Sequence, residues 1–225
     1  MSLFPPPQAR MASLRVMELR DVPFAVRLHQ DHLSQGFFVE LGEKFLRRYY
    51  RTFLTSPAAV ALVAEVDHRP AGFLVGCTDA DVHRRHVARL ERWRLARAGA
   101  ASLLVRPELA GKFIRTRAQR YTRSLRHAGH EPADEAPNER VGTLSHIAVD
   151  QAMRRHGVGS RLVNGFVNIA RVHGVSHLQL QTSPSNANAR QFYVDLGWQE
   201  QEQIHDNEGG VWIPFVKKLV TRNHT

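Results

Sequence analysis

The sequence predicts one mixed α/β domain, in which helices flank a central sheet of about six or seven strands. Three observations support this fold class. Segments with the two-residue alternation of strands are interleaved with segments of helical periodicity, which is typical of an α/β sheet. The chain of 225 residues has the length of one domain with an elaboration, and its 43% of apolar residues suffice for a sizeable core. A single cysteine, Cys77, argues against a disulfide framework or a cysteine metal cluster.

The first part of the chain is expected to form a strand, two helices and a hairpin. Residues 1–12 contain three consecutive prolines and are expected to be a disordered lead-in, so that the domain spans 13–220. The elements expected here are, in order, a strand over 13–20, a helix over 21–33 with Asp21 as its cap, a helix over about 40–55, and a hairpin of strands over 58–67 and 70–78.

The next segment is strongly basic. Residues 82–130 contain 13 Lys and Arg against 2 Asp and Glu, whereas the net charge of the whole chain is +10. The excess positive charge therefore belongs to this segment, which we interpret as a helical insertion with helices over about 81–98 and 107–127. Three interpretations remain open: a lid with solvated arginines, a surface for an anionic acceptor or an anionic membrane, and a surface for RNA phosphates.

The last part of the chain alternates strands and helices. An acidic stretch over 131–139 contains prolines and is expected to be a loop. The elements that follow are, in order, a strand over 140–149, a helix over about 157–173, a strand over 176–182, a helix over 185–197 that starts at Ser185 or Asn186 and stops at Gly197, and a hairpin of strands over 199–204 and 211–219.

The connection between the strand that ends at Val149 and the next helix has the composition of an anion-binding loop. Arg154 and Arg155 are followed by Gly157 and Gly159. Glycine lets the backbone approach a ligand, and the first amides of a helix attract an anion because they lack partners within the helix. The pattern predicts a pyrophosphate site, with a plain glycine-rich turn as the alternative. Neither the Rossmann nor the P-loop glycine pattern is present.

A second stretch makes the resemblance to a known family specific. Arg154-x-x-Gly157-x-Gly159 is similar to the acyl-CoA signature of the GNAT superfamily of N-acetyltransferases. Residues 186–198, NANARQFYVDLGW, resemble the motif that follows in that family. The two motifs stand in the family's order, with one helix and one strand between them. The resemblance is strong over about 140–200, weaker over the flanking strands, and does not cover the basic segment.

The resemblance implies a fold and a co-substrate. The implied fold is a mixed, mostly antiparallel sheet, splayed between its fourth and fifth strands, with the basic helical insertion between strands 3 and 4. Acetyl-CoA would occupy the splay without a metal, its pyrophosphate on the amides of 155–160 and its pantetheine arm beside 147–149. The residues implied to bind it are Ile147, Ala148, Val149, Arg154, Arg155, His156, Gly157, Val158, Gly159, Ser160, Asn186, Ala189, Phe192 and Tyr193.

Two of these residues have implied roles of their own. Asn186 matches the family's side-chain contact to the cofactor arm. Tyr193 matches the tyrosine that often donates a proton to the leaving CoA thiolate, and a phenol near sulfur can act as a general acid. The alternative for Tyr193 is a core aromatic residue beside Phe192.

The general base is not evident. Strand alternation places Thr143, Ser145, Ile147 and Val149 on one face, where many relatives carry a glutamate or histidine at an early position. His146 falls on the opposite face unless a bulge shifts the register. We therefore keep Ser145 and His146 as candidate catalytic residues, with a satisfied core histidine as the alternative for His146.

The acceptor site is expected among polar residues of the N-terminal half. His32 and Glu40 lie in the first two predicted helices, where relatives often shape the acceptor pocket, and Asp79 ends the third strand. His29 and Asp31 are further candidates for the base. Each of these residues has a surface position as its alternative.

The implied activity is the transfer of an acetyl group from acetyl-CoA to a primary amine by direct attack in a ternary complex. We expect a small-molecule acceptor, with an amino sugar or a sugar-nucleotide intermediate favoured because its phosphate would suit the arginines. The alternatives are a protein or tRNA-linked amine, and a non-catalytic CoA-binding module that binds nucleic acid through the insertion. Since no run of about 18 apolar residues and no signal peptide is evident, a cytoplasmic location is expected. A homodimer remains open.

Overall fold

The structure is a computed structural model that describes residues 12–33, 40–91, 140–205 and 210–219. Residues 1–11 of the predicted lead-in, most of the basic insertion and the acidic loop over 131–139 lie outside these ranges. Ala12, which was assigned to the disordered lead-in, is instead buried, and its carbonyl accepts from Arg161.

Helices and strands follow the predicted order within the described residues. The first part contains β1 (Ser13–Val16), η1 (Leu19–Asp21), α1 (Val22–His32), α3 (Glu43–Thr55), β2 (Ala59–Val66), β3 (Arg69–Cys77), α4 (Ala80–His86) and η2 (Val87–Glu91). The second part contains β4 (Val141–Val149), η3 (Gln151–Met153), α8 (Val158–Val172), β5 (His177–Thr182), α9 (Ala187–Asp195), β6 (Gln199–Glu200), β7 (Ile204–His205) and β8 (Val211–Lys218). The first strand is shorter than the predicted 13–20, because a helical turn starts at Leu19.

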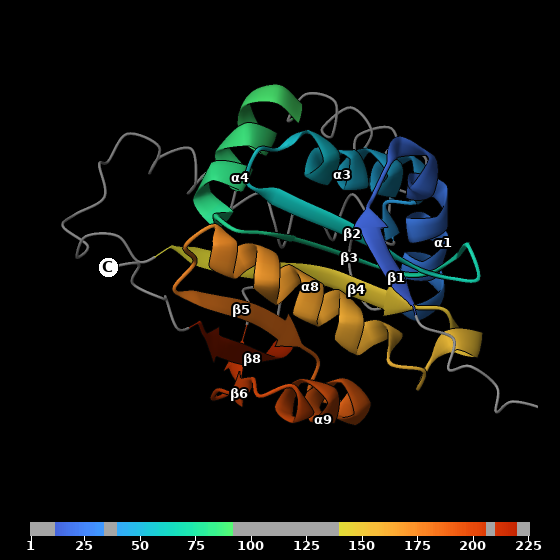
Figure 1. The fold of residues 1–225 in the computed structure, drawn as a ribbon. Helices are drawn as coiled ribbons and strands as arrows, with labels where there is room; N and C mark the ends of the chain where they lie inside the picture. The colour runs from blue at the N-terminus through green and yellow to red at the C-terminus, as the bar shows by residue number, and fades with distance from the viewer. Residues whose placement is uncertain (1–11, 34–39, 92–139, 206–209, 220–225) are drawn as a thin grey trace, which may run out of the picture.

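The strands form one open sheet in the order β1-β2-β3-β4-β5-β8-β6, and β7 also pairs with β8 (Figure 1). Neighbouring strands are antiparallel except for β4 and β5, which are parallel. The prediction of a mixed, mostly antiparallel sheet flanked by helices is therefore confirmed.

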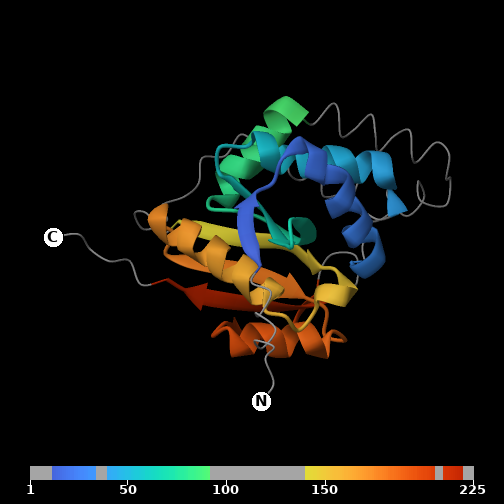
Figure 2. The same ribbon diagram turned by 45° about the vertical axis from the view of Figure 1, so that its right-hand side comes forward.

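Two apolar clusters lie on opposite faces of the sheet. Helix α8 covers one face, where Leu162 and Phe166 are fully buried against residues of β2, β3 and β4 (Figures 1 and 2). Helices α1 and α3 cover the other face, where Tyr50 packs with Phe73 of β3. Fully burying a large apolar side chain contributes about 1.5–3 kcal/mol, so both layers stabilise the centre of the sheet. Below we call these the α8 face and the α1/α3 face.

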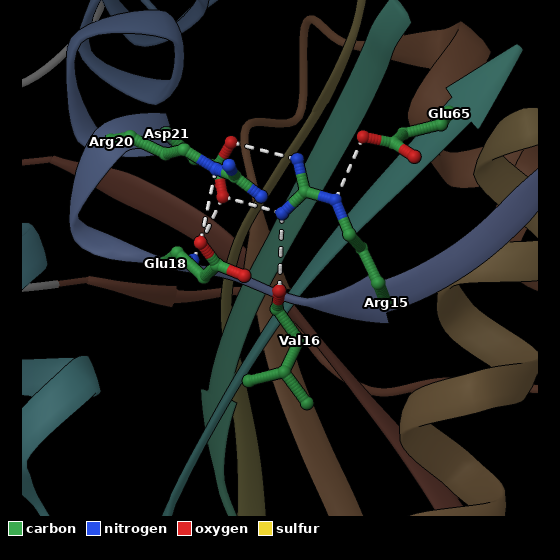
Figure 3. Close-up of polar contacts among 6 residues, drawn as sticks. All are labelled: Arg15, Val16, Glu18, Arg20, Asp21 and Glu65. Carbon is green, nitrogen blue, oxygen red and sulfur yellow. Dashed lines mark hydrogen bonds and ion pairs between the residues drawn. The ribbon is translucent and has the colours of Figure 1, made fainter. Parts of the chain in front are cut away.

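An ion-pair network fixes the start of α1 to the edge of the sheet (Figure 3). The Arg15 guanidinium on β1 donates to both carboxylate oxygens of Asp21, at 2.6 and 2.8 Å, and to Glu65 on β2 at 2.7 Å. The Asp21 carboxylate also accepts from the Glu18 amide. Asp21 is the N-cap residue of α1 as predicted, but its carboxylate makes no capping hydrogen bond to the helix and instead binds Arg15 and the Glu18 amide. The hydrogen bonds from Arg15 lower the pKa of the Asp21 carboxyl.

Candidate functional site

Strands β4 and β5 part within the sheet. Their parallel pairing includes Val141 with His177 and ends at Thr143 with Gln179. Strand β4 nevertheless continues to Val149 and β5 to Thr182. The predicted splay between the fourth and fifth strands is therefore present, and the last residues of β4 have no strand pairing on the β5 side.

A β-bulge lies at the point where the two strands part. On the β3 side, Val75 pairs with His146 but Gly76 pairs with Leu144, so Ser145 is an extra residue in β4. Gly76 leaves room for this irregularity, because a Cβ there would lie 2.5 Å from the Thr143 carbonyl oxygen. A glycine inside a strand often marks such a place.

The bulge changes which residues share a face. Leu144 packs on the α8 face, and Ile147 and Val149 pack there too, whereas His146 and Ala148 face α1 and α3. The prediction that Ile147 and Val149 share a face with Thr143 is therefore wrong. His146 was expected on the face opposite Thr143 unless a bulge shifted the register. The bulge at Ser145 does shift it, so His146 lies on the face of Thr143.

The connection from β4 to α8 has the geometry of an exposed anion-binding loop. The Asp150 carboxylate accepts from the Ala152 amide at 2.9 Å and fixes the turn after β4. Two loop residues have positive φ, Arg155 at 63° and Gly157 at 74°. The first backbone hydrogen bond of the helix runs from the Arg161 amide to the Gly157 carbonyl. The amides of 158–160 therefore precede that bond, at the positive end of the helix dipole.

The backbone of this loop is accessible. No heavy atom lies within 4 Å of the position that a Cβ would take at Gly157, and residues 154–157 are exposed. Arg154 turns back to the end of β4, where its Nε donates to the Val149 carbonyl at 3.3 Å. The His156 Nδ1 lies 2.8 Å from the Arg154 carbonyl oxygen. Arg155 is exposed in the same loop.

The structure brings the two predicted cofactor motifs together. The Phe192 ring on α9 lies 3.3 Å from the position that a Cβ would take at Gly159. Asn186 caps α9, because its Oδ1 accepts from the Ala189 amide at 3.1 Å. Ala189 and Phe192 are half-buried against the cluster on the α8 face. The close approach at Gly159 explains why a residue without a side chain stands there.

Tyr193 is a core aromatic residue. Its ring centroid lies 5.2 Å from that of Phe192, 5.8 Å from Trp198 and 5.7 Å from Phe215. Burial raises the pKa of its hydroxyl, which therefore keeps its proton at neutral pH. The alternative interpretation of Tyr193 as a core aromatic residue beside Phe192 therefore describes its packing. A proton-donating role for its hydroxyl stays a prediction.

The three predicted acceptor residues have separate positions. The Asp79 carboxylate caps α4 by accepting from the Asp81 and Val82 amides at 3.0 and 2.8 Å. His32 is half-buried at the end of α1, and Glu40 is half-buried shortly before α3. The role of these three residues at an acceptor stays a prediction.

A cluster that involves Tyr49 and Tyr50 was missed from the sequence. The His146 Nε2 lies 2.9 Å from the Tyr49 hydroxyl, and the His29 Nδ1 lies 2.6 Å from the Tyr50 hydroxyl. The rings of His29 and His146 are 5.0 Å apart. Burial lowers the pKa of His29 to about 4 and that of His146, with a smaller contribution from His29, to about 3. The adjacent tyrosines in an otherwise basic helix were the available signal.

Neither a metal-binding cluster nor a membrane-spanning helix is present in the described ranges. Among these residues, no group of three or more His, Cys, Asp or Glu side chains could hold a metal ion. No helix in the same part of the chain is both long and apolar enough to cross a membrane.

An open mixed sheet that splays after one parallel pair is the fold expected of the GNAT acetyltransferases. The sequence model of the acetyltransferase (GNAT) family matches residues 122–198. An uncharacterized N-acetyltransferase of Methanocaldococcus jannaschii is 29% identical over 79 residues, which are 35% of this chain and 33% of that protein. The alignment thus spans about a third of the relative's length. The resemblance to this family over the motif region is confirmed.

Solved structures confirm the fold. Ard1 from Thermoplasma volcanium has a TM-score of 0.56 at 15% identity, with 93% of this chain and 98% of that chain covered. The ribosomal-protein-S18-alanine N-acetyltransferase from Escherichia coli has a TM-score of 0.55 at 16% identity, with coverage of 96% and 99%. An aminoglycoside acetyltransferase in complex with coenzyme A has a TM-score of 0.56 at 14% identity, with coverage of 92% and 95%.

Proposed function

We propose that this chain is an acetyl-CoA-dependent N-acetyltransferase that acetylates a primary amine. The observation that carries the proposal is the contact of Phe192 with Gly159. It lies beside the amides of 158–160, which precede the first hydrogen bond of α8, and next to the gap between β4 and β5. The family match over 122–198 supports the same assignment. The free, buried Cys77 suits a reducing compartment such as the cytoplasm.

The loop and α9 supply groups that suit acetyl-CoA. The co-substrate would bring an activated thioester, and its pyrophosphate would bind the amides of 158–160 with added charge from Arg155. The Oδ1 of Asn186 already accepts from Ala189, so its Nδ2 group is the one left to donate to a carbonyl of the cofactor arm. The buried Tyr193 hydroxyl holds the proton that we assign to the departing sulfur.

The amine must lose protons during the reaction. An alkylamine has a pKa of about 10.4 and is mostly protonated at pH 7, so a base or a water chain is needed. Ser145 and His146 are the polar residues at the bulge where β4 leaves β5. A backbone amide in this irregular stretch is also placed to stabilise an oxyanion, which is commonly a large contribution to acyl transfer.

The acceptor that we propose is a small anionic amine, such as an amino sugar phosphate or a sugar-nucleotide intermediate. Helices α3 and α4 border the α1/α3 face and expose many cations, which would attract an anion and repel a polycation. The exposed cations on these helices and η2 are Lys44, Arg47, Arg48, Arg51, Arg84, Arg85 and Arg89. Glu43 pairs with Arg47 and Asp81 with Arg84, and the exposed cations of these elements outnumber their exposed carboxylates.

The same charge favours a second candidate, an amine carried by RNA or by a protein bound to RNA. A basic segment of 13 Lys and Arg against 2 Asp and Glu could neutralise several phosphates. This candidate includes a CoA-binding module without turnover. A steep loss of RNA binding as salt rises would support it, because each phosphate contact releases counterions.

Calorimetry of acetyl-CoA binding tests the loop assignment. Gly157→Asp places a negative charge against the pyrophosphate, and we expect the affinity to fall about 10- to 100-fold, which corresponds to about 1.4–2.7 kcal/mol. Gly174→Asp is a matched control, since Gly174 also has positive φ, 68°, and open space around its Cβ position, but lies past the far end of α8. Equal affinities in the two folded variants would contradict the assignment.

An amine panel with acetyl-CoA, read as free thiol, tests the activity itself. We expect turnover with at least one phosphorylated or nucleotide-linked amine and little with polycationic amines. Turnover only with polycations would contradict the acceptor class. Acetyl-CoA binding without any turnover would favour the non-catalytic module.

A further inference from the structure

One ring nitrogen of His146 is hydrogen-bonded to the Tyr49 hydroxyl, and the second ring nitrogen, Nδ1, can bind another group. Its Nε2 lies 2.9 Å from the Tyr49 hydroxyl on α3, and the ring is half-buried on the α1/α3 face. Among the described residues its hydrogen bond is made by Nε2, and Nδ1 is not one of the buried polar atoms that lack a partner. The ring lies one residue after the bulge at Ser145, where β4 no longer pairs with β5.

The chemistry of the pair decides where the ring proton lies. A phenol hydroxyl is a stronger donor than an imidazole N–H, and an imidazole nitrogen is a stronger acceptor than a phenol oxygen. The favoured bond therefore runs from the Tyr49 hydroxyl to Nε2 of His146. A neutral imidazole carries one proton, so that proton is then on Nδ1.

The surroundings keep both partners neutral. Burial raises the pKa of Tyr49 and lowers that of His146 to about 3. Among the described residues, titratable groups near the pair include His29 on α1, Tyr50 on α3 and Cys77 on β3. Burial lowers the pKa of His29 to about 4 and raises those of Tyr50 and Cys77, so each is uncharged at pH 7.

We propose that Tyr49 is a positioning residue that holds His146 as a neutral hydrogen-bond donor, with its Nδ1–H directed to an oxygen of the transferred acyl group or of the acceptor. Polar side chains on the same face support this, since the Thr143 hydroxyl and the Gln179 amide lie 3.3 Å apart at the end of the β4–β5 pairing. On this assignment His146 does not accept the amine's proton, and water or another group does. The identity of the bound oxygen rests on the proposed function, but the ring tautomer does not.

Nuclear magnetic resonance of ¹⁵N-histidine-labelled protein tests the tautomer without any substrate. Loss of one set of signals in His146→Asn assigns the ring. We expect the wild-type ring to carry its proton on Nδ1 and not to titrate between pH 5 and 8, and Tyr49→Phe to give a mixture of tautomers. A wild-type proton on Nε2, or a titration near pH 6.5, overturns the proposal.

Kinetics with the best amine of the panel test the donor role. Asparagine places an N–H close to where Nδ1 stands, so His146→Asn should keep at least about tenfold more turnover than His146→Ala. Tyr49→Phe should lower kcat by about tenfold and leave the KM for acetyl-CoA unchanged. If His146→Asn and His146→Ala lose the same amount of turnover, and both lose the acidic limb of the kcat–pH profile, His146 is a general base and the proposal is overturned. Absence of acetyl transfer by the wild type would instead refute the proposed function, and the tautomer measurement would still decide this inference.

Discussion

The predicted anion-binding loop and the cluster around His146 lie at the two ends of residues 146–149, the last four of β4, yet they are built in opposite ways. The loop consists of consecutive residues, 150–160, and the groups that we propose to bind the pyrophosphate are backbone amides at the start of one helix. The His146 cluster combines side chains from α1, α3 and β4 that are far apart in the sequence. A site whose binding groups are backbone amides keeps its geometry as long as a few glycines are retained. A site whose binding groups are side chains can change with every substitution. On the proposed function, the first side would serve acetyl-CoA and the second the acceptor.

Tyr193→Phe is the variant expected to have the largest effect on this comparison. The ring packs with Phe192, Trp198 and Phe215, and phenylalanine keeps that packing. Loss of the proton donor should lower turnover by about 10²–10⁴-fold and leave acetyl-CoA affinity unchanged. Turnover and calorimetry on the same preparation measure both quantities. Full turnover in the variant would show that another group or water donates the proton.

Gly76→Ala tests whether the bulge depends on the missing side chain. The new Cβ would lie 2.5 Å from the Thr143 carbonyl oxygen and 2.8 Å from the Phe166 ring. Such overpacking typically costs about 1–3 kcal/mol in the free energy of unfolding, which urea denaturation measures. Gly165→Ala is the control, because its Cβ would meet the Cδ1 end of the flexible Leu14 side chain. The control should stay within about 1 kcal/mol of wild type, and equal losses would contradict the role of Gly76.

The difference between the two sides also explains what the sequence could predict. The loop, its glycines, the cap at Asn186 and the splay followed from local patterns and from the family's motifs, and the structure places Gly159 against Phe192. The face of His146 could not be predicted, because it depends on a register shift against β3 at Gly76. The partnership of Tyr49 with His146 spans 97 positions in the sequence and has no local pattern.

The pH dependence of stability measures how strongly the His146 cluster is buried. Burial lowers the pKa of His29 to about 4 and that of His146 to about 3, below the ordinary value of about 6.5 that applies after unfolding. Between pH 6.5 and 4 the unfolded chain binds more protons than the folded chain, so the free energy of unfolding falls as the pH falls. The stabilisation that comes from keeping these histidines neutral is fully present above pH 6.5. Each buried histidine contributes at most about 1.4 kcal/mol per pH unit.

Substitution of one histidine should flatten this dependence. Urea denaturation of His29→Gln from pH 7.5 to 5 should show a shallower slope than wild type. His205→Gln, at an exposed position on β7, should keep the wild-type slope. A slope that is the same in all three proteins would mean that His29 titrates normally in the folded state.

Substitution of the exposed arginines near α4 is expected to have the smallest effect, and it should change the KM for the acceptor but not that for acetyl-CoA. Arg85→Gln with Arg89→Gln removes two exposed charges from α4 and η2. Long-range attraction between exposed charges is weak, so we expect the acceptor's KM to rise about two- to fivefold at low salt, and the KM for acetyl-CoA to stay level.

Arg69→Gln is the control, since Arg69 lies at the start of β3, whereas α4 follows the other end of that strand. At 0.15 M salt the Debye length is about 8 Å, so the difference should shrink there. A rise in the KM for acetyl-CoA instead would assign these arginines to the cofactor side and break the division between the two sides.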